Sequence, residues 1–91
     1  MSVTVRIPTP LRKITKDLDV VEAGGDDLSA ILADLESNYP GIMDRIVDEA
    51  GEMRRFVNVF LNGEDVRFLD GLTTVVAEGD EISIVPAVAG G

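Results

Sequence analysis

The sequence contains no cysteine and no histidine among its 91 residues. Without cysteine, the chain has no disulfide bonds, no thiolate metal site and no cysteine nucleophile. Histidine is the usual general base near neutral pH, so its absence removes the commonest way to activate a nucleophile. The acidic residues are scattered, and no spacing among them marks a catalytic pair. We therefore expect a protein that is not itself an enzyme, with no catalytic residue, no metal site and no bound cofactor.

Long apolar runs are also missing from the chain. No window approaches the roughly 20 consecutive apolar residues of a membrane span. The first residues show no charged leader followed by an apolar stretch, so we expect no secretory signal. The length suits a single domain. These observations favour a cytoplasmic protein without a membrane partner.

Basic residues are few, with 8 lysines and arginines against 17 acidic residues, for a net charge of −9. Such a surface repels nucleic acid and anionic membranes and favours basic protein partners, although solubility alone also explains it. Arg54 and Arg55 form a small basic spot. This spot either contacts an acidic partner or pairs with nearby acidic side chains.

Apolar residues alternate with polar ones in several short segments, which is typical of half-buried strands. The predicted strands are residues 3–7, 19–23, 56–61, 66–68 and 82–85. Asn62-Gly63 is a favoured pair for a tight hairpin with positive φ, and it precedes residues 66–68 as the return strand. Pro86 lacks a backbone donor, so we expect the chain to leave the sheet there.

One segment carries a helical stripe instead. Its apolar residues recur every three or four positions, at Leu28, Ile31, Leu32, Leu35 and Tyr39. Asp26 is the expected N-cap, and Pro40-Gly41 ends the helix. Residues 42–47 predict a shorter helical segment, and residues 48–55 predict a loop. Further along, Leu72 and Val75 are expected to anchor a connection to the core.

The order of these elements favours an α+β fold in which a mixed sheet wraps around one main helix. This is the β-grasp, or ubiquitin-like, arrangement, in which the first and last strands are central neighbours. We expect a β-grasp domain over residues 1–86 and a flexible tail over residues 87–91. The tail ends in Gly90 and Gly91, which have wide backbone freedom and no side chain to pack.

The strand pattern also predicts which side chains face away from the helix. If Val57 and Val59 point inward, the outer face of the sheet carries Arg6, Phe60 and Val85, with Phe56 toward one end. Exposed apolar side chains among polar ones mark a protein contact surface, so these residues are the predicted partner-binding set. In the alternative, the loop of residues 48–55 covers Phe56 and Phe60.

Several segments resemble the ThiS/MoaD family of ubiquitin-like sulfur carriers over essentially the whole chain. They are the hairpin VNVFLNGEDVRF, the turn and strand AEGDEISIVPAVAGG, and the terminal Gly-Gly. The opening IPT-LR, the central RFVN and the ending PAVAGG are most similar to the CysO-type carriers of cysteine biosynthesis. ThiS proteins themselves are usually shorter.

The resemblance implies that an E1-like adenylating enzyme of the ThiF/MoeB type activates the Gly91 carboxylate with ATP and magnesium. Sulfur then displaces AMP and leaves a thiocarboxylate on Gly91. Gly90 and the preceding Ala87, Val88 and Ala89 would enter the partner as a narrow tail. In CysO-type systems the thiocarboxylate attacks an activated serine derivative in a cysteine synthase that uses pyridoxal phosphate (PLP). A metal-dependent protease then releases the cysteine.

Other functions remain open on the sequence. A MoaD-like chain would be the small subunit of molybdopterin synthase and would donate its sulfur to a pterin. A ubiquitin-like modifier would be joined through Gly91 to lysines of target proteins. A small acidic binding module with an idle tail is the remaining alternative. The residues alone do not identify the final sulfur acceptor among cysteine, a pterin, a thiazole precursor and tRNA.

Overall fold

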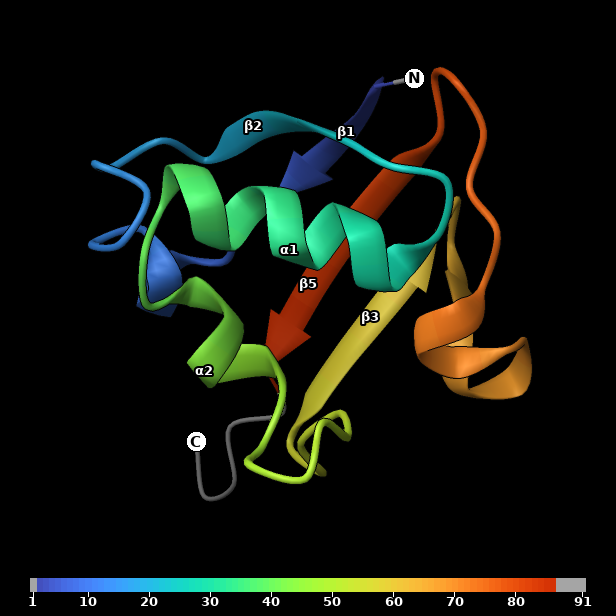
Figure 1. Cartoon of the computed structure of the whole chain (residues 1–91). Helices are drawn as coiled ribbons and strands as arrows, with labels where there is room; N and C mark the ends of the chain where they lie inside the picture. The colour runs from blue at the N-terminus through green and yellow to red at the C-terminus, as the bar shows by residue number, and fades with distance from the viewer. Residues whose placement is uncertain (1, 87–91) are drawn as a thin grey trace.

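A mixed sheet forms one layer of the computed structural model, which describes residues 2–86; within that range the five strands follow the order β2-β1-β5-β3-β4 (Figure 1). The strand bounds are Ser2–Arg6 (β1), Val20–Gly24 (β2), Val57–Leu61 (β3), Glu64–Asp65 (β4) and Glu81–Pro86 (β5). β1 and β5 pair in parallel, whereas the other neighbours are antiparallel. The β-grasp prediction is therefore confirmed, including the first and last strands as central neighbours.

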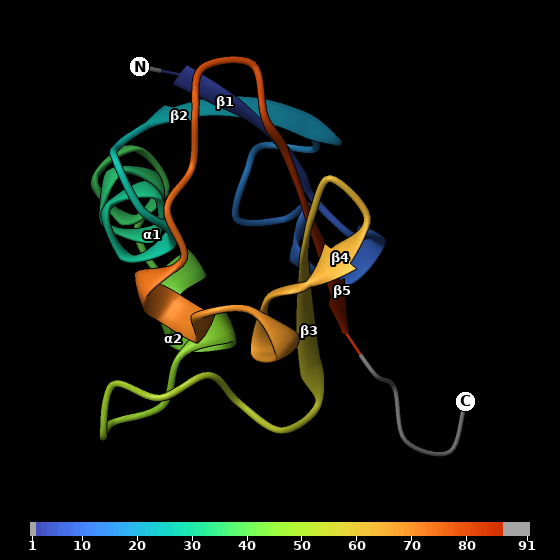
Figure 2. The same ribbon diagram turned by 90° about the vertical axis from the view of Figure 1, so that its right-hand side faces the viewer.

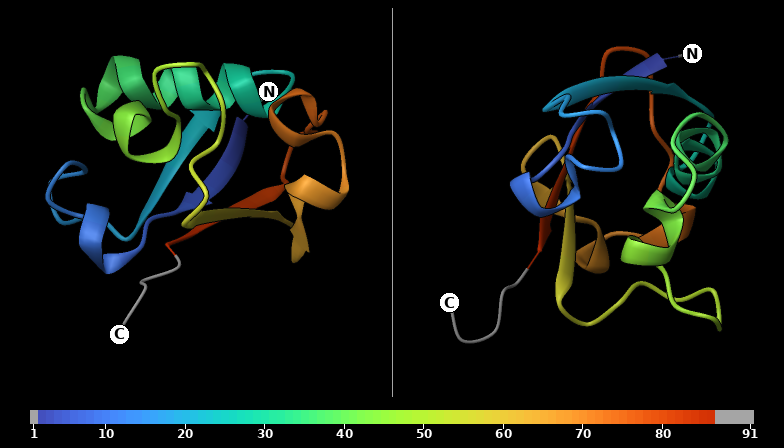
Figure 3. Two further views of the ribbon diagram at one scale, coloured as in Figure 1. Left: turned by 90° about the horizontal axis from the view of Figure 1, so that it is seen from below. Right: turned by 90° about the vertical axis from the view of Figure 1, so that its left-hand side faces the viewer.

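One face of this sheet is covered by helix α1 (Leu28–Asn38) and the shorter helix α2 (Ile42–Ile46), as Figure 1 and Figure 3 show. The predicted stripe is confirmed, because its first four members are buried: Leu28, Ile31, Leu32 and Leu35. Tyr39 lies one residue beyond the helix, at its C-cap, and packs against the core while partly exposed. Inward-facing strand residues complete the core, among them Val5, Val59 and Ile82.

The predicted N-cap of the main helix is wrong by one residue. The Asp27 carboxylate, not that of Asp26, accepts the backbone N–H of Ala30 at 2.8 Å. The carbonyl of Asp26 instead accepts the N–H of Val76 at 3.1 Å. This contact to a distant segment fixes the backbone of Asp26 and leaves Asp27 at the start of the helix.

Gly25, between β2 and α1, allows the backbone to lie close to the first turn of α1. A Cβ at this position would lie 2.7 Å from the Ala30 Cβ and 2.9 Å from the Ala30 carbonyl carbon. Backbone atoms of a helix cannot move aside cheaply, so only glycine fits this approach. The Gly25 position therefore helps to set the distance between the helix and the sheet.

The hairpin after β3 turns where predicted but returns differently. Asn62 and Gly63 have φ values of 51° and 90°, as a tight hairpin turn requires. However, the return strand β4 is Glu64–Asp65, and Val66–Phe68 forms a 3-10 turn, η2, rather than a strand. The Asp65 carboxylate accepts the N–H of Arg67 at 2.9 Å, which starts this turn and ends the strand.

The next connection contains a second 3-10 turn, η3 (Gly71–Thr73). Leu72 packs against the core as predicted. The prediction for Val75 is wrong, because Val75 is 73% exposed and its neighbour Val76 is buried. The carbonyl of Thr74 accepts the N–H of Leu28 at 2.9 Å, so the chain pairs with the start of α1 and turns Val76 inward.

Asp80 joins the turn before β5 to the hairpin turn after β3. Its carboxylate accepts the N–H of Ala77 at 2.8 Å and the side-chain amide of Asn62 at 3.1 Å. These bonds favour the ionised form, so they lower the pKa of Asp80 below its ordinary value of 3.8, and the bond from Ala77 is the larger cause. The ionised carboxylate therefore holds two loops together at one end of the sheet.

We expect Leu35→Ala to lower the free energy of unfolding by about 2–5 kcal/mol, because it removes buried surface and leaves a cavity. Leu35 has 0% exposure, whereas Leu18 is 46% exposed. The matched change Leu18→Ala should alter the free energy of unfolding by no more than about 0.5 kcal/mol. Urea denaturation measures both values, and equal losses would contradict this description of the core.

Asp80→Asn should destabilise the fold in a pH-dependent way. The pKa of Asp80 is lower in the folded chain than in the unfolded chain. The stabilising effect of the carboxylate is therefore complete above pH 3.8 and disappears as the pH falls through the lowered pKa of the folded chain. The difference in unfolding free energy between parent and variant should be largest near neutral pH and should close in strong acid. A difference that stays constant across this range in urea denaturation would contradict the role of the ionised carboxylate.

Candidate functional site

The candidate site lies where β5 ends, because this strand leads toward the terminal glycines. β5 lies between β1 and β3. β1 pairs with its first residues, 81–83, whereas β3 pairs with it as far as Pro86, so the end of the strand is held by β3. Pro86 is the last described residue. The predicted tail contacts at Ala87, Val88 and Ala89, the sulfur-carrying Gly90 and Gly91, and the predicted flexibility of this segment lie outside the described residues.

Pro86 is the last residue of β5. The prediction that the strand ends at residue 85 and that the chain leaves the sheet at Pro86 is therefore wrong by one residue. Pro86 pairs with Val57 of β3. The N–H of Asn62 donates to the carbonyl of Glu81 at 2.8 Å, so these two residues form a hydrogen-bonded pair. Hydrogen-bonded and non-hydrogen-bonded pairs alternate along an antiparallel ladder, which makes Val57 and Pro86 a non-hydrogen-bonded pair. Proline fits this position because no donor toward β3 is required.

Figure 2 shows the helices on one side of the sheet. The opposite, outer face carries three of the four predicted residues, Arg6, Phe60 and Val85. Arg6 and Phe60 both pair with Ser83, so the three side chains form one row across β1, β5 and β3. Phe60 is half-buried, and Val85 is 43% exposed. Arg6 is also exposed and forms a salt bridge of 3.0 Å with Glu81. The predicted facing of Arg6, Phe60 and Val85 is confirmed, and their role in binding stays a prediction. The prediction that Phe56 lies toward one end of this face is wrong, because Phe56 precedes β3 and lines a pocket with the buried Val57 and Ile84.

A shallow pocket of about 330 Å³ lies on this outer face beside the end of β5. Arg6, Pro8, Val85 and Pro86 contribute to its walls. Its lining is mostly apolar and includes the end of β1 as well as β5. A partner that receives the tail would meet this pocket immediately beside Pro86.

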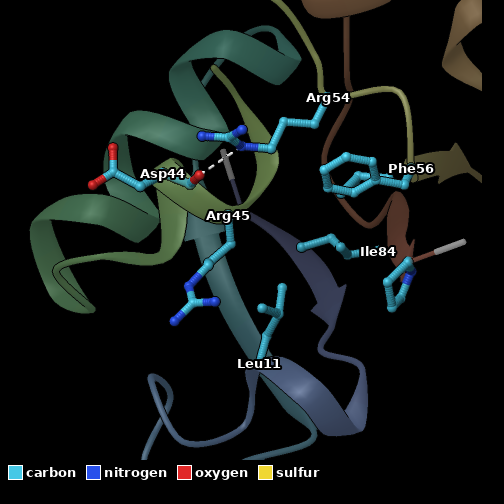
Figure 4. A pocket seen from close by; sticks show the side chains of 8 residues that line it. Leu11, Asp44, Arg45, Arg54, Phe56 and Ile84 are labelled. Atoms are coloured by element: carbon cyan, nitrogen blue, oxygen red, sulfur yellow. Dashed lines mark hydrogen bonds between the residues drawn. The ribbon is translucent and has the colours of Figure 1, made fainter. Parts of the chain in front are cut away.

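A second pocket, of about 340 Å³, lies on the helix side of the same strand end (Figure 4). We call it the helix-side pocket, and its lining residues are Leu11, Asp44, Arg45, Arg54, Phe56, Val57, Ile84 and Pro86. Phe56 is 55% exposed, so the alternative in which the preceding loop covers it is wrong. Arg54 donates through Nε to the carbonyl of Asp44 at 2.8 Å, so it is bound to backbone instead of an acidic side chain.

Sequence reasoning missed the helix-side pocket as a site. Its residues come from the turn η1 (Thr9–Leu11), from α2, and from the segments around β3 and β5. Only the tertiary fold brings these segments together. In the sequence, the feature that could have indicated a binding site here was the Arg54-Arg55 pair, which lies in an acidic chain directly before Phe56.

The chemistry of this end suits binding more than catalysis. The two pockets combine apolar walls with arginine side chains and contain no hydroxyl–carboxylate pair arranged for proton transfer. Within residues 2–86, no group of three or more acidic, histidine or cysteine side chains could hold a metal ion. In the same range, no helix is long and apolar enough to cross a membrane.

Comparison with known proteins gives relatives that share the full length of the chain. The sulfur carrier protein CysO of Mycobacterium tuberculosis is 53% identical over 93 residues, and the alignment covers 100% of both chains. Small archaeal modifier protein 3 of Haloferax volcanii is 33% identical over 93 residues, again with 100% of both chains covered.

The fold is also similar to that of a solved structure. A chain in the crystal structure of the Amycolatopsis orientalis BexX/CysO complex matches with a TM-score of 0.93 and 49% sequence identity, and the match covers 98% of this chain and 99% of that chain. The profile of the ThiS family matches residues 5–91, which includes both terminal glycines and β5. The chain therefore belongs to the ThiS family.

Proposed function

We propose that this chain is a CysO-type sulfur carrier, a protein cosubstrate that bears sulfur as a thiocarboxylate on Gly91. The observation that carries the proposal is the 53% identity to a sulfur carrier over the full length of both chains. The central position of β5 supports it, because a rigid strand end gives partner enzymes a fixed surface beside the terminal residues.

Activation requires a partner, because a carboxylate is a poor electrophile. In the proposed first step, an E1-like enzyme of the ThiF/MoeB type lets a Gly91 carboxylate oxygen attack the α-phosphorus of ATP, with magnesium bound to the phosphates. Pyrophosphate leaves, and an acyl adenylate forms. A sulfur nucleophile then attacks the acyl carbon, and AMP leaves with the former carboxylate oxygen. The partner carries ATP and magnesium, and the carrier supplies the docking surface and the terminal carboxylate.

The proposed acceptor is a PLP-dependent cysteine synthase, in which the thiocarboxylate sulfur bonds to the β-carbon of an activated serine derivative and the activating group leaves that carbon. The resulting cysteine remains attached through the Gly91 acyl carbon. A metal-dependent protease then hydrolyses the bond between that carbon and the cysteine, which restores the Gly91 carboxylate. The similarity to CysO supports this acceptor over a pterin. We place these steps in the cytoplasm, where ATP is available for activation.

A second candidate function is protein modification through Gly91. It is favoured by the 33% identity to small archaeal modifier protein 3 over both full chains. In that case the activated Gly91 would be joined to a lysine amine of a target protein. The chain has lysines at positions 13 and 16 only, so conjugation of one copy to another has few attachment points.

Incubation with a ThiF/MoeB-type enzyme, ATP, magnesium and sulfide should raise the intact mass of the carrier by the difference between a sulfur and an oxygen atom. A variant lacking Gly91 should gain no sulfur, because the activated carboxylate is displaced by one residue. Its melting temperature should equal that of the parent, because the described core lies between Val3 and Ile84. Intact-mass spectrometry and thermal denaturation measure the two effects.

An unchanged mass for the parent under these conditions would contradict the sulfur-carrier proposal. Unchanged mass together with conjugates of high molecular weight in extracts would support the modifier function instead. Sulfur gained by the variant without Gly91 would show that the reactive carbon lies elsewhere.

Val85→Asp should lower kcat/KM for thiocarboxylate formation by about tenfold, because it places a charge in an apolar contact beside the tail. Val75→Asp is the matched control. Val75 is also an exposed valine, at 73% against 43% for Val85. It pairs with Asp27 at the start of α1 and lines neither pocket. Equal rates for the two variants, with unchanged melting temperatures, would remove this part of the outer face from the docking surface.

A further inference from the structure

Arginine side chains gather at the end of the domain where β5 stops. Arg45 and Arg54 line the helix-side pocket together with Pro86, and Arg6 lines the outer pocket with the same proline. Arg67 donates to the Asn58 side chain at 2.7 Å, and Asn58 pairs with Val85 near the end of β5. Four arginines thus lie around the strand end in a chain whose net charge is −9. Of these, Arg6 is paired with Glu81, and Asp44 lines the same pocket as Arg45 and Arg54.

Acidic side chains mark the opposite end of the same strand. Glu78 accepts the backbone N–H of Ser2 at 3.1 Å, at the start of β1. Asp80 lies directly before β5 and bonds to the hairpin turn at Asn62. Figure 1 shows this turn and the end of β5 at opposite ends of the sheet. The two ends of the strand therefore differ in arginine content, although Asp44, Asp48 and Glu49 lie near the pocket arginines at the end of β5.

The helix-side pocket combines this positive charge with an apolar wall. Figure 4 shows Phe56, Ile84 and Leu11 beside the arginines. The Nε–H of Arg54 donates to the Asp44 carbonyl at 2.8 Å, which holds the guanidinium at the rim of the pocket. Burial of an exposed phenylalanine would contribute binding energy, and a fixed guanidinium would contribute direction.

The pocket arginines have no acidic partner in the described part of the chain. Within residues 2–86, the only salt bridge joins Arg6 to Glu81. Asp44 is the one acidic residue of the pocket lining, and its carboxylate points away from Phe56 and Ile84 in Figure 4. Asp48 and Glu49 line a neighbouring pocket with Arg54, but no salt bridge to Arg54 is formed within residues 2–86. An acidic ligand would therefore meet two arginines that form no salt bridge in that range.

We propose that the helix-side pocket docks an acidic segment of the activating enzyme. An apolar side chain of that segment packs on Phe56 and Leu11, and its carboxylates pair with Arg45 and Arg54. The rest of the carrier surface repels such a segment, so long-range attraction orients the carrier with its tail toward the partner. This proposal rests on the proposed function, because it assigns a surface to the activation step.

The test compares charge changes in the activation assay with a ThiF/MoeB-type enzyme, ATP, magnesium and sulfide. Arg45→Glu should lower kcat/KM by about tenfold, mainly through KM, because it repels the acidic segment. Lys16→Glu makes the same change in net charge at a position that lines neither pocket, and it should have little effect. Arg45→Lys should keep most of the parent's kcat/KM, and Arg45→Gln, which keeps a good helix former, should lower it about threefold.

Added salt gives a second readout. The kcat/KM of the parent should fall as ionic strength rises, and that of Arg45→Glu should fall much less, because screening acts on the attraction that the variant has lost. If Arg45→Glu, Arg45→Gln and Lys16→Glu all match the parent, the pocket proposal is overturned while the sulfur-carrier function stands. If the parent itself gains no sulfur, the proposed function fails, and the pocket proposal fails with it.

Discussion

The parallel pairing of β1 with β5 is the constraint on which the rest of the molecule depends. Parallel neighbours need a crossover connection, and here the crossover includes α1, which covers one face of the sheet. The pairing places the last strand at the centre, with hydrogen bonds to β1 and β3 on its two sides. β1 pairs with residues 81–83 and β3 pairs with the strand as far as Pro86, next to the residues that carry the proposed chemistry.

In the proposed function, the domain around this strand serves binding, and the reactions take place in partner enzymes. Two pockets border the end of β5, one on the outer face beside Val85 and one on the helix side beside Phe56. The first is mainly apolar, and the second adds two arginines that form no salt bridge within residues 2–86. A partner that contacts both sides would fix the orientation of the strand end, while the acidic remainder of the surface limits unproductive encounters.

Local periodicity was enough to predict the sheet, the main helix and the outward facing of Arg6, Phe60 and Val85. The errors occurred where a long-range contact decides between neighbours: Val76 bonds to the Asp26 carbonyl, so the cap moved to Asp27. Val66, however, was assigned to a strand because it follows the alternating pattern. The bond from the Arg67 N–H to the Asp65 carboxylate is local, and an aspartate at this position is the signal that could have indicated the turn. The helix-side pocket was missed since Leu11, Arg45 and Phe56 meet only in the folded chain.

Hydrogen–deuterium exchange of the carrier, alone and with its activating enzyme, tests the central claim most directly. In the free carrier, the amides of β5 should exchange only through global unfolding, because both neighbours of the strand protect them. Binding should add protection around residues 54–57 and at the end of β1, on the two sides of Pro86. Fast exchange in free β5, or new protection confined to α1 and the η2–η3 segment, would contradict the account.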